Sequence, residues 1–234
     1  LPARCRQGRL PSRMGGVDNR SDQQAIELTV IIFSLIWRCR KCQARKNSKK
    51  SLEQFEIDPE VSARIGQGYE DICDRSPKKT RAAYFKRAVD IMAENVDAET
   101  LQAVFEWNAC CKGGAREKAS KAFAKENARL SIDERLQKIK DVPYMGQPVR
   151  NEDGTITVHA VYCSNGERFF CACTNFNDPK CDLAVSKQYC FCCAGHFRHH
   201  YEIMLGVKLK TVEIVSSPLD SGGKNPCVIR YAID

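Results

Sequence analysis

The sequence predicts an α+β fold, with a helical N-terminal half followed by a β-β-α-β-β antiparallel-sheet module. Two observations carry this prediction. Helix-start signals and helical spacing of apolar residues recur between residues 58 and 142, and two-residue alternation begins only after Pro148. The chain has 234 residues, 43% of them hydrophobic, which is enough to bury a core. We expect a helical region at 51–148 and a Cys-rich module at 149–234, packed together as one domain.

Helices are expected wherever a capping residue or Ser-Pro step precedes apolar residues at helical spacing. Asp58-Pro59 is such a start, and Ser131 begins a capping-box pattern. Gly113-Gly114 separates the middle helices. The expected helices follow Asp58, cover 82–95, follow Asp97, cover 115–127 and follow Ser131.

The second half alternates apolar and polar residues in short segments bounded by turn residues, which is typical of strands. A helix that ends at Gly206 interrupts the strands. The expected elements are strands at 155–162 and 168–174, a loop and helix at 187–205, and strands at 208–216 and 227–233.

Charge is concentrated in the first 50 residues, which hold 12 of the 37 basic and 3 of the 29 acidic side chains. The remaining residues are nearly neutral, so we expect no nucleic acid partner for the folded part. The apolar run at 28–37 is too short to span a bilayer and lacks a signal-peptide cleavage site, so we expect no membrane span and a cytoplasmic protein.

Residues 1–50 are therefore expected to be a basic extension, disordered or upstream of the true start. A basic arm, a membrane-surface anchor and half of a zinc knuckle at Cys39 and Cys42 are the alternatives.

Cysteine is the informative residue type, because seven of the 14 cysteines lie between residues 163 and 193. Two C-x-C pairs, Cys171/Cys173 and Cys190/Cys192, can each aim two sulfurs at one point. Four converging thiolates suit Zn²⁺ or an iron–sulfur cluster. We expect these four cysteines to hold zinc, with Cys181, Cys193, His196 and Cys227 as further ligands or hydrogen-bond partners of a coordinated thiolate.

Disulfides, catalytic thiols and plain packing remain alternatives to a metal site. The sequence assigns no catalytic residue, because nothing pairs a nucleophile with a base. His196 is expected to pack against the sheet, while His199 and His200 face solvent. A second group consists of Cys73, Cys110, Cys111 and Arg116, where the Gly113-Gly114 amides beside Arg116 suit an anion or form a helix–helix corner with buried thiols.

The C-terminal 45 residues also resemble a module of prokaryotic proteins. The resemblance rests on 189–197 (YCFCCAGHF), Tyr201-Glu202, 205–209 (LGVKL), Val212-Glu213, 216–219 (SSPL) and 227–229 (CVI). The relatives are 4-vinyl-reductase-like ligand-binding domains, proteins similar to L-2-amino-thiazoline-4-carboxylic acid hydrolase, and a bacterial family of unknown function. That family also has a Cys/Gly/Arg motif like 110–116.

The resemblance implies a curved antiparallel sheet, helices that form a small-molecule pocket, and cysteines that hold zinc. The residues that match its motif are Cys171, Cys173, Cys190, Cys192, Gly195, Glu202 and Cys227. The chain departs from the motif at Cys193 and at the turn 222–225.

We therefore expect a zinc-binding protein with a small-molecule-binding or sensing role. A zinc- or thiol-dependent hydrolase and an iron–sulfur redox protein are the alternatives, and oligomerisation stays open.

Overall fold

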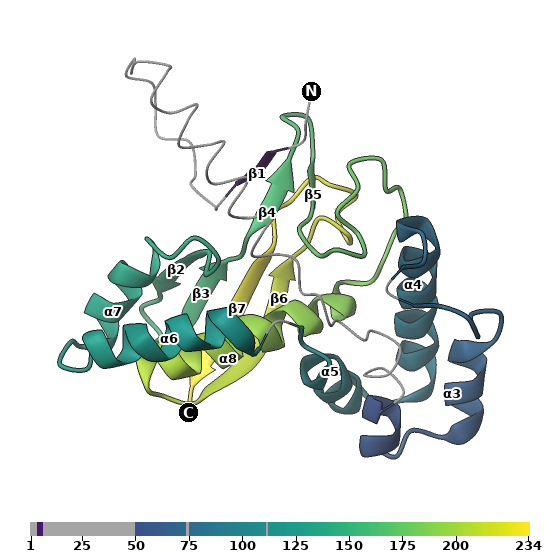
Figure 1. The fold of residues 1–234 in the computed structure, drawn as a ribbon, viewed down its shortest axis with the longest axis horizontal. Coiled ribbons are helices and arrows are strands. Elements are labelled where there is room, and N and C mark those ends of the chain that lie inside the picture. The colour runs from purple at the N-terminus through teal and green to yellow at the C-terminus, as the bar shows by residue number, and fades with distance from the viewer. Residues whose placement is uncertain (1–3, 7–49, 74, 111) are drawn as a thin grey trace.

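The computed structural model describes residues 4–6, 50–73, 75–110 and 112–234. Within these segments the α+β fold is confirmed, with helices in the first half and antiparallel strands after them (Figure 1). The apolar run at 28–37, the Cys39/Cys42 pair and Cys111 lie outside the described residues, so the expectations about them stay predictions. The basic head contributes one described element, strand β1 (Arg4–Arg6), although the sequence there has no strand periodicity.

Helices α3, α5 and α7 of the first half begin at the capping residues that the sequence predicts. Asp58 and Asp97 each accept a backbone N–H of the following helical turn, and Ser131 forms a complete capping box with Glu134. The helices are α3 (Pro59–Gly66), α4 (Lys78–Asn95), α5 (Ala98–Trp107), α6 (Gly114–Glu126) and α7 (Ile132–Ile139).

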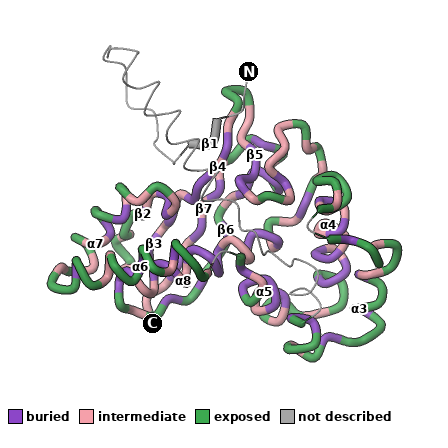
Figure 2. Tube along the Cα trace, in the orientation of Figure 1, coloured by how far each residue is buried: buried purple, intermediate pink, exposed green. Residues whose placement is uncertain are grey.

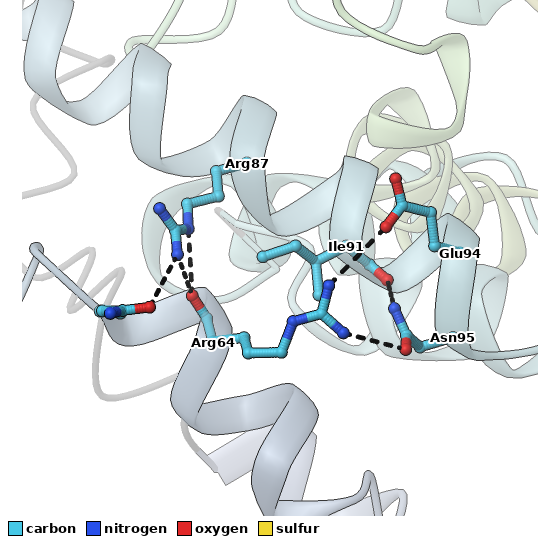
Figure 3. Close-up of polar contacts among 6 residues, drawn as sticks. Arg64, Arg87, Ile91, Glu94 and Asn95 are labelled. Atoms are coloured by element: carbon cyan, nitrogen blue, oxygen red, sulfur yellow. Dashed lines mark hydrogen bonds and ion pairs between the residues drawn. The ribbon is translucent and has the colours of Figure 1, made fainter.

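Polar contacts fix α3 against α4 at the edge of the helical half (Figure 3). The Arg87 guanidinium donates from Nε and Nη2 to the Arg64 carbonyl, at 3.0 and 2.7 Å. Arg64 in turn donates to the Asn95 side chain at 3.2 Å and lies 3.8 Å from Glu94. These side chains are exposed, so we assign the main stabilisation of the pair to apolar burial of residues such as Ile65 and Met92.

Two antiparallel sheets form the second half. The larger has the strand order β2 (Gln147–Arg150), β3 (Ile156–His159), β7 (Val228–Ile233) and β6 (Leu209–Ser216). The smaller has the order β1, β4 (Tyr162–Ser164) and β5 (Phe169–Cys171), and its β4–β5 hairpin extends beyond the end of the larger sheet (Figure 1).

Two strand predictions are wrong in detail. The segment 155–162 is not one strand, because the chain leaves the larger sheet after β3 and enters the smaller one at β4. Two consecutive buried residues, Ala160 and Val161, mark this corner and break the alternation. Strand β2 was not expected, since Pro148 argues against a strand, but β2 is an edge strand, where proline is tolerated.

Helix α8 (Phe191–Leu205) covers one face of the larger sheet and lies beside α6 (Figure 1). A short 3-10 turn, η1 (Lys187–Cys190), leads into it, and Gly206 ends it with a positive φ of 73°. The Tyr231 hydroxyl on β7 donates to the Ala194 carbonyl at 2.9 Å, which fixes helix to sheet. The core between these layers is continuous with that of the helical half (Figure 2).

No helix in the described segments has the length and apolar character that crossing a membrane requires.

Candidate functional site

Six cysteines from separate elements gather where α8 begins. Cys171 ends β5, Cys173 follows it, Cys227 immediately precedes β7, and the others belong to η1 and α8. We call this group the thiol cluster: Cys171, Cys173, Cys190, Cys192, Cys193 and Cys227. All six are free thiols, whereas Cys163 on β4 is disulfide-bonded.

In the first predicted pair, Cys171 and Cys173, the pKa values of the two thiols are shifted in opposite directions. The Cys173 sulfur lies 3.3 Å from the Tyr189 hydroxyl, and the Cys173 N–H donates to the Cys171 sulfur at 3.4 Å. The hydrogen bond from the Cys171 thiol, with those from Tyr189 and two backbone amides, lowers the pKa of Cys173 to about 6 despite its burial. The same bond, together with burial, raises the pKa of Cys171. One thiolate of this pair is therefore present at neutral pH.

Cys190 and Cys227 complete the buried part of the cluster. Burial raises the pKa of Cys190 to about 12, although its sulfur is hydrogen-bonded to the Ser217 hydroxyl at 3.1 Å. Burial also raises the pKa of Cys227 and of Cys193. The charges of Cys227 and Cys190 further raise the pKa of Cys171, after its hydrogen bond to Cys173 and its burial. Residues from β5, η1 and the segment before β7 thus lie close enough to influence one another electrostatically.

Cys192, the fourth predicted ligand, has a different environment. Its sulfur points to the carbonyl of Asn108, after the end of α5, at 3.7 Å. The pKa of Lys112 is lowered by burial, and the negative charge of Cys192 opposes that shift. Cys192 therefore lies at the edge of the thiol cluster, next to the loop that follows α5, while Cys227 is one of the buried thiols.

Helix α8 also carries a buried histidine pair, and here the expectation for His200 is wrong. His200 is fully buried, with Nδ1 2.9 Å from the Ser120 hydroxyl of α6. His196 is buried as well, 3.3 Å from Arg116 through Nε2 and 3.0 Å from the Cys110 carbonyl through Nδ1. Since a guanidinium only donates, Nε2 of His196 accepts and Nδ1 carries the proton. The two ring nitrogens of His196 thus hold α8 against α6 and against the loop that precedes α6, which sequence spacing could not show.

The residues of the second predicted group lie in different environments. Arg116 is buried, and its guanidinium lies over the Tyr144 ring at 5.3 Å. His196 bridges Cys110 and Arg116, since it bonds to the Cys110 carbonyl and lies beside the Arg116 guanidinium, and Cys110 itself is exposed rather than buried as the corner interpretation expects. Cys73 is exposed in the turn between α3 and α4.

Cys181 lies in the loop between β5 and η1, with its carbonyl accepting from Arg168 at 3.4 Å. It lines a cavity of about 150 Å³ together with Cys171. The cavity walls are mainly aromatic and aliphatic, with Phe170, Phe176 and Leu219 among them.

As the side chains stand, no group of three or more His, Cys, Asp or Glu residues in the described part of the chain is arranged to hold a metal ion. The sulfurs instead make hydrogen bonds to Tyr189 and Ser217. The sequence interpretation missed both partners. Tyr189 directly precedes the second C-x-C pair, which is a usable signal, but nothing in the spacing marks Ser217.

Comparison of the chain with family models, with curated proteins and with solved structures finds no match. The resemblance to 4-vinyl-reductase-like domains therefore stays a prediction.

Proposed function

We propose that the protein binds zinc through its thiol cluster and that the bound ion supports a small-molecule-binding or sensing role in the cytoplasm. The observation that carries the proposal is the meeting of Cys171 and Cys173, Cys190 and Cys227 from three separate elements. Four thiolates in a tetrahedron are a ligand set that Zn²⁺ favours. We take these four as the ligands, with Cys192 as the alternative fourth.

Holding a metal would require the cysteine side chains to change rotamer, because as they stand no group of three or more His, Cys, Asp or Glu in the described part of the chain is arranged for it. Turning a cysteine to another χ1 rotamer moves its sulfur by about 3 Å without moving the backbone. The hydrogen bonds to Tyr189 and Ser217 would then be exchanged for metal–sulfur bonds. Since its hydrogen bonds lower the pKa of Cys173, this thiol loses its proton more readily than Cys171 or Cys190, and those thiols would lose theirs on binding.

A complete set of four protein ligands favours a structural ion over a catalytic one, which keeps an open position. Zinc would tie the β4–β5 hairpin to the start of α8 and to β7. The cavity beside Cys171 is the place that we propose for a small molecule, and its volume of about 150 Å³ is below the roughly 300–1,000 Å³ of sites for drug-sized ligands. The hydrolase and iron–sulfur alternatives remain outcomes of the test.

Cobalt titration of reduced, metal-free full-length protein tests the proposal, because thiolate-bound cobalt absorbs in the near-ultraviolet and visible. We expect saturation near one equivalent for the wild type. The Cys227→Ser variant should lose most of the thiolate charge-transfer intensity, while Cys192→Ser and the exposed control Cys73→Ser should keep it.

If the thiolate charge-transfer intensity is lost in Cys192→Ser instead of Cys227→Ser, the ligand set is the one that the spacing alone predicts. Protein that is brown as purified and contains iron would favour the iron–sulfur alternative. Absence of any cobalt spectrum, with a rapidly alkylated Cys173, would favour thiol catalysis.

A further inference from the structure

Cys171 and Cys173 are neighbouring free thiols at the end of strand β5. The strand ends at Cys171 and the chain then bends, which brings the Cys173 N–H to 3.4 Å from the Cys171 sulfur. The two side chains are also hydrogen-bonded to each other. A disulfide requires two sulfurs that can approach to about 2 Å, so a pair of thiols already in hydrogen-bond contact is suited to form one.

The other thiols near the start of α8 are bonded elsewhere. The Cys190 sulfur is hydrogen-bonded to the Ser217 hydroxyl at 3.1 Å, and the Cys192 sulfur points to the Asn108 carbonyl at 3.7 Å. None of the hydrogen bonds in the described part of the chain joins Cys190 or Cys192 to Cys173. Cys171 is therefore the thiol that the fold presents to Cys173 as a disulfide partner.

A small oxidant can reach this pair of thiols. Cys173 is only partly buried, and Cys171, although 7% exposed, lies in the wall of the cavity of about 150 Å³. Hydrogen peroxide is little larger than water, and a cavity of about 15 Å³ on the same kind of measure already holds a water molecule. An accessible cysteine with a second cysteine beside it is the arrangement in which oxidation ends in a reversible disulfide.

We infer that Cys171 and Cys173 form a reversible disulfide with hydrogen peroxide as the oxidant, and that this disulfide switches metal binding off. The more exposed Cys173 sulfur attacks one peroxide oxygen, the O–O bond breaks, and a sulfenic acid and one water form. The Cys171 sulfur then displaces the sulfenic hydroxyl, which leaves with the Cys171 thiol proton as a second water. The pair thus loses two electrons and two hydrogens, and the peroxide is reduced to two waters.

The disulfide stands on the geometry of the two thiols, whereas its effect on metal binding rests on the proposed function. Two of the four proposed ligands, Cys171 and Cys173, are joined to each other in the oxidised protein. Since thiolates are the metal ligands, a disulfide removes both from the set. Two cysteines are too few for the closed four-ligand site of a structural zinc ion.

Peptide mapping of the full-length protein tests the disulfide. Trypsin cuts after Arg168 and Lys180, so the peptide 169–180 carries Cys171 and Cys173 and no other cysteine. After reduced, metal-free protein is treated with hydrogen peroxide and then alkylated, we expect this peptide to lack two hydrogens and to carry no alkyl group. Dithiothreitol should restore both thiols. The peptide 188–198, which carries three other cluster cysteines, is the internal control and should be alkylated at all three.

Cobalt binding tests the effect of the disulfide on the metal site. Oxidised wild-type protein should show no thiolate charge-transfer band until dithiothreitol is added. In the Cys190→Ser variant the peptide 169–180 should still lose its two hydrogens, whereas in Cys173→Ser it should not. A circular dichroism spectrum of each variant confirms that it is folded, and the wild-type peptide map does not depend on any variant.

Two results would overturn the disulfide and leave the zinc proposal intact. One is a peptide 169–180 that keeps both thiols after peroxide treatment, and the other is a disulfide that joins it to the peptide 188–198. An unchanged cobalt spectrum in protein that carries the Cys171–Cys173 disulfide would overturn the switch. If reduced wild-type protein binds no cobalt, the proposed function fails and the switch fails with it, while the peptide map alone decides whether the disulfide forms.

Discussion

At the scale of single residues, the environment of each cysteine decides its chemistry. Cys173 and Cys190 have the same side chain and lie in one cluster, yet the pKa of Cys173 is lowered to about 6 while that of Cys190 is raised to about 12. The difference follows from hydrogen bonds, because Cys173 receives several that favour its thiolate, whereas burial dominates at Cys190. The cluster thus contains one ready nucleophile or ligand among protonated neighbours.

Tyr189 is the residue whose removal tests this account of Cys173. Tyr189→Phe keeps the ring, which packs against Phe176 at 4.8 Å, but removes the hydroxyl beside the sulfur. Because that hydroxyl favours the thiolate, its loss should raise the pKa of Cys173. We expect the lowest thiolate titration step of metal-free protein, followed by ultraviolet absorbance, to move from about pH 6 to higher pH.

Tyr69→Phe is the control for that titration, since Tyr69 lies in the turn after α3 and packs on Tyr84 in the helical half. A titration step that stays at the wild-type position in Tyr189→Phe would show that the hydroxyl does not stabilise the Cys173 thiolate.

At the scale of elements, the approach of α8 to α5 positions the second C-x-C pair. Gly195 makes this approach possible, because a Cβ there would lie 2.7 Å from the Glu106 carbonyl oxygen and 3.0 Å from the Ala109 Cβ. Arg198, on the same helix, pairs with the buried Glu106 at 2.6 Å. The close contact therefore holds the N-terminal end of α8, and the cysteines on it, against the helical half.

Gly195→Ala should force the two helices apart and reduce the free energy of unfolding by about 1–3 kcal/mol. Urea denaturation measures this change. Gly66→Ala is the matched control, because nothing lies within 4 Å of a Cβ at Gly66 and its backbone is helical. We expect that control to be neutral or slightly stabilising. Equal stability of Gly195→Ala and wild type would mean that the interface adjusts and does not depend on glycine.

At the scale of the whole molecule, local signals predicted the elements better than their assembly. Capping at Asp97 and Ser131 and the glycine end of α8 follow from short-range chemistry, so they were visible in the sequence. The corner at Ala160–Val161 was not, because it depends on which sheet each strand joins. The sequence predicted Cys171, Cys173, Cys190 and Cys192 as ligands and Cys227 as a further one, but only the fold could show that the Cys192 sulfur points to the Asn108 carbonyl.

The whole molecule also explains why the cluster is placed where it is. The β4–β5 hairpin belongs to the small sheet, and only short strands support it. The thiol cluster lies between that hairpin, α8 and β7, so an ion bound there would join three elements of the second half of the fold. Metal binding would then be coupled to folding, as in other small metal-stabilised structures.

Metal content is the measurement that tests the central claim most directly. Full-length protein, expressed without affinity histidines and purified under reducing conditions, is analysed for zinc and iron alongside its visible spectrum. The account predicts about one zinc per chain, no visible absorption, and loss of the zinc in a Cys171→Ser/Cys190→Ser double variant. Folded wild-type protein that carries no metal and shows all cluster thiols open to titration would contradict it.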